Sequence, residues 1–165
     1  MALTDELTRL PNRRHILALA EEAMHQVRRR GGALSLMALD VDHFKRINDR
    51  HGHDAGDRVL VRVAQACQQA LGRDGRVGRV GGEEFLVLLP AADAQAALAA
   101  AETIRARVAA IHTGDIAANL EVTASVGVAL AQRDETAWTS VVRRADAALH
   151  AAKAGGRNRV VLATA

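Results

Sequence analysis

The sequence predicts an α+β domain in which helices surround a central mixed or antiparallel sheet. Three observations carry this prediction. Helix-like and strand-like segments follow one another in the order α-β-α-α-β-β-α-β-α-β. In the middle, two strand-like runs flank Gly81-Gly82, a pattern typical of a β-hairpin, which excludes an all-parallel sheet. No linker-like tract and no repeat interrupts the chain, so residues 1–165 are expected to form one domain.

Local signals set the expected bounds of these elements. Asn12 is a helix-capping residue type, apolar positions at helical spacing follow it, and the cations Arg28-Arg29-Arg30 suit a helix C-terminus. Short apolar runs that end at turn residues indicate buried strands, and Pro90 ends one of them. The expected helices cover 13–30, 44–50, 54–71, 93–111 and 138–153, and the expected strands cover 33–39, 76–80, 84–89, 120–131 and 159–162.

Composition restricts the classes of function. Hydrophobic residues make up 49% of the chain, enough for a buried core. The formal net charge of +3 fits an anionic ligand such as a nucleotide, and it also fits ordinary solubility. With no Tyr, one Trp and two Phe, few side chains could stack on single-stranded bases, which disfavours a nucleic-acid-binding module. No apolar run is long enough to span a membrane and no signal peptide precedes the first helix, so we expect a soluble, cytoplasmic protein without membrane contact. The single cysteine, Cys67, falls on an apolar helical face and is expected in the core.

A first candidate site lies where the first strand ends. Asp40 and Asp42 stand between this strand and a short helix, whose free backbone N–H groups could hold phosphate. Mg²⁺ prefers one or two carboxylates together with phosphate oxygens, so Asp40 could hold the ion against such a phosphate. The alternative is that both acids are helix caps or solvated loop residues, and two acids at a strand end favour this alternative when taken alone.

A second candidate is the turn of the expected hairpin, Gly81-Gly82-Glu83-Glu84. The glycines permit a tight turn and leave room for a ligand against the backbone. Neighbouring strand residues point to opposite faces, so Glu83 and Glu84 would not share one direction. One of them could reach a metal and the other a second metal or a reacting hydroxyl. The alternative is an ordinary hydrophilic turn.

A third candidate pairs Lys153 with Arg157 across the end of the last helix. Two cations four residues apart could clasp a triphosphate. The alternative, which is favoured for this motif alone, is a cationic helix C-terminus followed by Gly155-Gly156.

A fourth candidate combines an amide with a carboxylate. The segment holds Asn48-Asp49, Asp54 and Asp57, and an Asn amide with an Asp carboxylate could together read guanine, because a carboxylate accepts from N1–H and N2–H₂. Two histidines in the same segment, His51 and His53, suggest a metal, but they lack the further Cys or His partners of a zinc site.

All four clusters occur together and in order, and with them the sequence resembles the GGDEF family of diguanylate cyclases. The resemblance spans nearly the whole chain. The matching segments are 5–14, 40–49, 51–53, Gly56-Asp57, 79–85, 145–149, Lys153 and 156–158. Several separated motifs at consistent spacing are far more specific than any one of them.

The resemblance implies a nucleotidyl-cyclase fold related to the polymerase palm, with a five-stranded central sheet. It also implies Mg²⁺, with Mn²⁺ as an alternative, held by carboxylates and one carbonyl. The implied metal ligands are Asp40, Glu83, the carbonyl of Val41 and, near a second ion, Glu84. The implied phosphate ligands are backbone groups of His43, Phe44 and Lys45 and the side chains of Lys45, Lys153 and Arg157. The remaining implied substrate-binding residues are Asn48 and Asp57 for guanine, with His53, Gly81 and Gly82.

The implied reaction condenses two GTP molecules into cyclic di-GMP with release of two pyrophosphates. Glu83 is the family's usual candidate for helping to deprotonate the 3′-hydroxyl, with Glu84 and Asp40 as the other catalytic candidates. Each domain would hold one GTP, so a second copy must face it. The chain begins at the catalytic signature, so it is expected to be cut from a longer signalling protein with an N-terminal sensor or receiver domain. The alternative is a catalytically inactive GTP-binding regulatory domain of the same fold.

Two departures from the family pattern carry expectations. Arg9 stands where the opening signature usually has Gly, away from the expected active site, so little effect on catalysis is expected. Many members have an Arg and an Asp, three residues apart, that bind product and inhibit. Gly72 and Gly75 hold those positions here, and the adjacent Arg73 and Asp74 cannot reproduce the spacing. The expectation is that this primary inhibitory site is absent.

Overall fold

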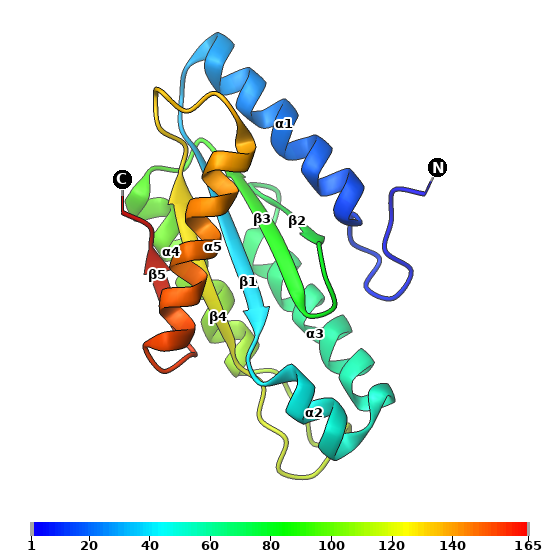
Figure 1. Cartoon of the computed structure of the whole chain (residues 1–165). Coiled ribbons are helices and arrows are strands. Elements are labelled where there is room, and N and C mark those ends of the chain that lie inside the picture. The colour runs from blue at the N-terminus through cyan, green and yellow to red at the C-terminus, as the bar shows by residue number, and fades with distance from the viewer. Residues whose placement is uncertain (1, 165) are drawn as a thin grey trace.

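The fold is a five-stranded sheet with helices on both faces, as a computed structural model that describes residues 2–164 shows (Figure 1). The helices are α1 (Arg13–Arg30), α2 (Phe44–His51), α3 (His53–Leu71), α4 (Ala94–Ala109) and α5 (Trp138–Ala154). The strands are β1 (Leu34–Val41), β2 (Arg76–Arg79), β3 (Glu84–Pro90), β4 (Ala124–Leu130) and β5 (Val160–Leu162). The predicted element order and the α+β class are confirmed.

The strand order is β2-β3-β1-β4-β5, so β1 is the central strand. All neighbouring pairs are antiparallel except β4 and β5, which are parallel, and the expected hairpin is formed by β2 and β3. Strand β4 begins at Ala124, four residues later than the spacing predicts. Leu120 and Val122 are nevertheless buried, because this segment packs its apolar side chains on the core while its backbone follows the turn after β1.

Side chains of the central strand alternate between two apolar layers. Met37, Leu39 and Val41 pack with α3 and α4, whereas Leu36 and Ala38 pack with α1 and α5. Figure 1 shows α1 and α5 in front of the sheet and α3 and α4 behind it. Every residue of β1 is buried, as expected for a central strand covered on both faces.

Local signals for helix ends and for the core are confirmed. The side chain of Asn12 accepts a hydrogen bond from the His15 N–H at 3.0 Å, and Asp93 caps α4 in the same way. Cys67 is fully buried, and burial raises the pKa of its thiol to about 12, so it behaves as a small apolar core residue. No helix within residues 2–164 combines the length and the apolar character needed to cross a bilayer.

Two glycines let the front helices approach the sheet closely. A Cβ atom added to Gly127 of β4 would lie 2.2 Å from both the Ala145 carbonyl oxygen and the Leu149 nitrogen of α5. A Cβ atom on Gly78 of β2 would lie 2.5 Å from Cβ of Ile16 in α1. Each helix is therefore held tightly over one side of the sheet.

We expect Gly127→Ala to lower the free energy of unfolding by about 2–4 kcal/mol, because its methyl group would overlap the backbone of α5 and push the helix outward. Urea denaturation measures the change. Gly114→Ala is the matched control, since Gly114 lies in an exposed loop and its added Cβ would meet only the His112 side chain. A Gly127→Ala protein as stable as this control would contradict the close packing.

Candidate active site

The candidate site lies at the end of the central strand, where three segments meet. Figure 1 shows the tip of the β2–β3 hairpin beside the end of β1, with α2 directly below. Asp40 of β1 is the register partner of Glu84 in β3, and the Val41 N–H donates to the Glu83 carbonyl oxygen at 3.2 Å. These backbone contacts bring both hairpin glutamates next to Asp40, as predicted.

Asp40 is a buried charge. The residue is 5% exposed, and its Oδ2 accepts from the Lys153 ammonium of α5. Its Oδ1 is also buried and has no hydrogen-bond partner among residues 2–164. Burial raises the pKa of Asp40 to about 6; the Lys153 ammonium opposes this shift, and the negative charges of Glu83 and Glu84 add to it. Asp40 is therefore neither a helix cap nor a solvated loop acid.

Asp42 has a structural role that the sequence did not reveal. It is 5% exposed and accepts from the hydroxyls of Thr123 at 2.7 Å and Ser125 at 2.6 Å. It also accepts from the Asn158 N–H at 3.0 Å. Asp42 thus ties the turn after α5 to the end of β1. In the sequence, only the hydroxyl residues Thr123 and Ser125, which stand in an otherwise apolar segment, could have indicated this role.

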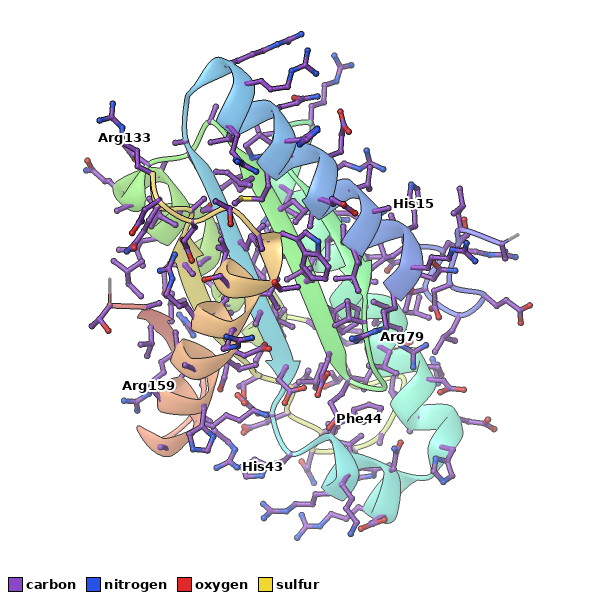
Figure 2. The ribbon with its side chains drawn as sticks, turned by 45° about the horizontal axis from the view of Figure 1, so that its top comes forward. His15, His43, Phe44, Arg79, Arg133 and Arg159 are labelled. Carbon is purple, nitrogen blue, oxygen red and sulfur yellow. The ribbon has the colours of Figure 1, made fainter. Side chains whose placement is uncertain are left out.

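The turn between β1 and α2 fits the predicted phosphate cradle. His43 adopts the left-handed conformation (φ 54°) and α2 begins at the next residue, Phe44. The first N–H groups of a helix have no partners within the helix, so they are available to an anion. Figure 2 places Phe44 at the start of α2 below the hairpin. Phe44 is buried, whereas His43 and Lys45 are exposed.

The residues predicted to read guanine lie on two helices that pack together, Asn48 on α2 and Asp57 on α3. A Cβ atom on Gly56 would lie 1.8 Å from Asn48 Oδ1, so the Asn48 amide packs directly on this glycine. Asn48 Oδ1 is buried and has no partner in the described part of the chain. The next residue, Asp57, is exposed and lines a cavity of about 400 Å³ together with Leu7. His53 is exposed at the first position of α3.

Of the two predicted cations, Lys153 contacts Asp40 from the end of α5, and Arg157 lies in the turn after this helix. Lys153 contacts Asp40, a pairing that the sequence did not predict. Arg157 is left-handed (φ 65°), and its N–H donates to the Ala152 carbonyl at 3.0 Å. The cationic helix end is thus part of the site and not only a helix terminus.

Arg79 binds the backbone of the hairpin tip, a role that the sequence analysis did not predict. Its guanidinium donates to the carbonyl oxygens of Gly81 at 3.1 Å and Gly82 at 2.9 Å, and it pairs with Asp5 at 3.3 Å. Asp5 also accepts from the Thr8 N–H and hydroxyl. Burial would raise the pKa of Asp5, but the bonds from Thr8 and the charge of Arg79 outweigh it and hold the pKa low. Figure 2 shows Arg79 between the hairpin and the N-terminal segment.

The carboxylates fit a hard divalent cation shared with a phosphorylated ligand. Within residues 2–164, no three His, Cys, Asp or Glu side chains are placed to hold a metal ion on their own. Mg²⁺ does not require such a cage, because it is bound by one or two carboxylates plus substrate phosphates. Asp40, with an unpartnered buried oxygen beside Glu83 and Glu84, meets this requirement.

Comparisons with known proteins agree with this geometry. Residues 2–159 match the family described as "Diguanylate cyclase, GGDEF domain". Diguanylate cyclase DgcP of Pseudomonas aeruginosa is 43% identical over 98% of this chain, and diguanylate cyclase A of Treponema denticola is 38% identical over 98%. The chain spans only 24% and 44% of these two relatives.

Solved structures show the same fold. The GGDEF domain of DgcB from Caulobacter crescentus, determined in complex with c-di-GMP, superposes with a TM-score of 0.93 at 36% identity, covering 100% of this chain and 95% of that one. Diguanylate cyclase SiaD of P. aeruginosa, determined with its activator SiaC, superposes with a TM-score of 0.91 at 43% identity, covering 98% and 62%.

We expect Asp40→Asn to raise the free energy of unfolding by about 1–3 kcal/mol at pH 8. The pKa of Asp40 is higher in the folded state than the usual 3.8, so the ionised carboxylate destabilises the fold as pH rises through the interval from about 4 to about 6. The neutral amide avoids this cost, and the released Lys153, about one-third exposed, can turn to water. Urea denaturation at pH 4 and pH 8 should show a gain that is larger at pH 8. A variant less stable than the parent at pH 8 would refute the destabilising charge.

Proposed function

Because the chain belongs to the diguanylate cyclase GGDEF domain family, we propose that it joins two GTP molecules into cyclic di-GMP. One observation carries the proposal. Two buried side-chain oxygens lack a hydrogen-bond partner within residues 2–164, and they belong to Asp40 and Asn48. Buried polar atoms are normally satisfied, so these two atoms are suited to a ligand. They are the residues expected at the metal-phosphate end and at the guanine end of GTP.

The chain's own groups would bind GTP from both ends. The N–H groups at the start of α2 would hold the terminal phosphates, helped by Lys45, Lys153 and Arg157. The Asn48 amide and the Asp57 carboxylate would bind the guanine edge, where N1–H and N2–H₂ are donors. Adenine carries a lone pair at N1, so Asp57 would disfavour ATP.

Asp40, Glu83 and the Val41 carbonyl would hold Mg²⁺, with Glu84 near a second ion. The bound cations would stabilise the charge that develops on the entering and leaving oxygens. Lys153 would then be released from Asp40 and face the phosphates. The turn anchored by Asp42 would keep Arg157 in place.

In the proposed reaction, the 3′-oxygen of one GTP forms a bond to the α-phosphorus of the other. The bond from that phosphorus to the bridging oxygen breaks, and pyrophosphate leaves. Glu83 would help to remove the hydroxyl proton. The same exchange between the second pair of groups closes the ring. One domain holds one GTP, so two copies must face each other, and much of the rate gain would come from positioning.

The relatives named above are two to four times longer than this chain. We therefore propose that further domains, such as an N-terminal sensor or receiver, set how often two copies meet. Such control would act from the cytoplasm, where GTP is available.

The central experiment incubates the purified protein with GTP and Mg²⁺ at several protein concentrations and separates the nucleotides by chromatography. We expect cyclic di-GMP to form at a rate that rises faster than linearly with protein concentration, because two copies are needed. GTP that binds tightly but stays intact at the highest concentration would replace the proposal with a regulatory GTP-binding role.

Replacing Asp57 should relax the choice of base. In Asp57→Ser, the carboxylate that accepts from guanine is lost, so the preference of kcat/KM for GTP over ATP is expected to fall by about tenfold or more. Asp54→Ser is the matched control, since Asp54 is an exposed acid in the same helix turn outside the expected contacts. An unchanged preference would remove Asp57 from base recognition.

Product should inhibit this chain weakly. Gly72 ends α3 with a positive φ of 57°, and a Cβ on Gly75 would lie 3.0 Å from the Leu88 carbonyl oxygen. The turn carries glycine at both positions of the expected Arg and Asp pair, and at Gly75 the backbone of β3 leaves little room for a side chain. Initial rates measured with added cyclic di-GMP should show no potent noncompetitive inhibition. Such inhibition at low product concentration would contradict the expectation.

A further inference from the structure

A cleft between α1 and α5 shares Asp40, Glu84 and Lys153 with the candidate active site, and its apolar part has no role in the reaction proposed above. Its volume is about 220 Å³. Its apolar wall includes Leu17 of α1, Leu86 of β3, and Trp138 and Val142 of α5. Figure 1 shows these two helices on the same face of the sheet.

The cleft follows from how the two helices are seated. Helix α5 is held against β4 at Gly127, and α1 is held against β2 at Gly78. The cleft lies over the strands between them, and residues 38–40 of β1 and 84–86 of β3 line it. The small side chain of Ala38 lies at this point of the cleft lining and does not fill the space.

The residues that line the cleft carry a net negative charge. Three carboxylates line it, from Asp40, Glu84 and Asp146, together with the cations of Lys153 and Arg13. Lys153 is paired with Asp40, and the Arg13 guanidinium donates to the Val80 carbonyl at 3.0 Å. Glu84 and Asp146 line the same cleft, and neither of these two cations forms an ion pair with them. They are close enough that partial burial, and then the charge of Glu84, raise the pKa of Asp146, with Arg13 opposing.

We propose that this cleft binds a small aromatic monocation, with its ring on the Trp138 wall and its cationic group between Glu84 and Asp146. The apolar wall requires a flat apolar body, and the net negative charge selects against anions and neutral molecules. The volume is below the roughly 300–1,000 Å³ of sites for drug-sized ligands, so a single ring with a short cationic group is the size that fits.

The probe is benzamidine, and Trp138, the only tryptophan of the chain, reports its binding by fluorescence. The titration uses the full chain without GTP or Mg²⁺, so its outcome does not depend on turnover. We expect a saturable change with benzamidine. Benzamide, which has a similar shape and no charge, should bind about tenfold more weakly or not at all.

Asp146→Asn should weaken benzamidine binding by about tenfold, since it removes one of the two charges that face the cation. Glu21→Gln is the matched control, because Glu21 is an exposed acid on α1 outside the cleft, and its affinity should equal that of the parent. Equal affinity for benzamide and benzamidine, a fluorescence change without saturation, or an Asp146→Asn protein that binds like the Glu21→Gln protein would each overturn the proposal.

Discussion

The geometry of the candidate site depends on a carboxylate that is buried at the end of the central strand. All eight residues of β1 are shielded by helices on both faces, and the strand ends with the charge of Asp40 still inside this layer. A charge at such depth is tolerated only with a partner. The partner, Lys153, comes from the end of α5, and α5 can deliver it because Gly127 lets the helix lie against β4. The close packing of α5 on β4 therefore also places the cation that neutralises Asp40.

Local chemistry made the fold predictable. The Asn12 and Asp93 caps, the Gly81-Gly82 turn and the apolar periodicity all act within a few residues, and the elements formed where these signals stand. The main error, a strand beginning at 120 and not at 124, arose because buried side chains alternate there without backbone pairing.

The candidate site was predictable as a set of residues but not as a set of contacts. The structure brings Asp40, Glu83 and Glu84 together and packs Asn48 on Gly56, the residue before Asp57. The pairs that hold the site join residues far apart in the chain, 113 positions for Asp40 with Lys153 and 74 for Asp5 with Arg79. Asp42 looked equivalent to Asp40 in sequence, yet its hydrogen bonds are filled by Thr123, Ser125 and Asn158. The difference between Asp40 and Asp42 depends on which loop packs against each side chain, and a local sequence pattern does not contain this information.

The contact made by Arg79 has a mechanical consequence. One guanidinium holds the carbonyl oxygens of Gly81 and Gly82 and the carboxylate of Asp5, while Thr8 closes the turn around that carboxylate. The segment before α1 and the loop carrying Glu83 and Glu84 thus contact the same planar group. Two further bonds join the same parts of the chain: the Arg79 N–H donates to the Pro11 carbonyl oxygen at 3.0 Å, and the Arg13 guanidinium donates to the Val80 carbonyl oxygen at 3.0 Å. A displacement of the segment before α1 would therefore reach the hairpin through these polar contacts.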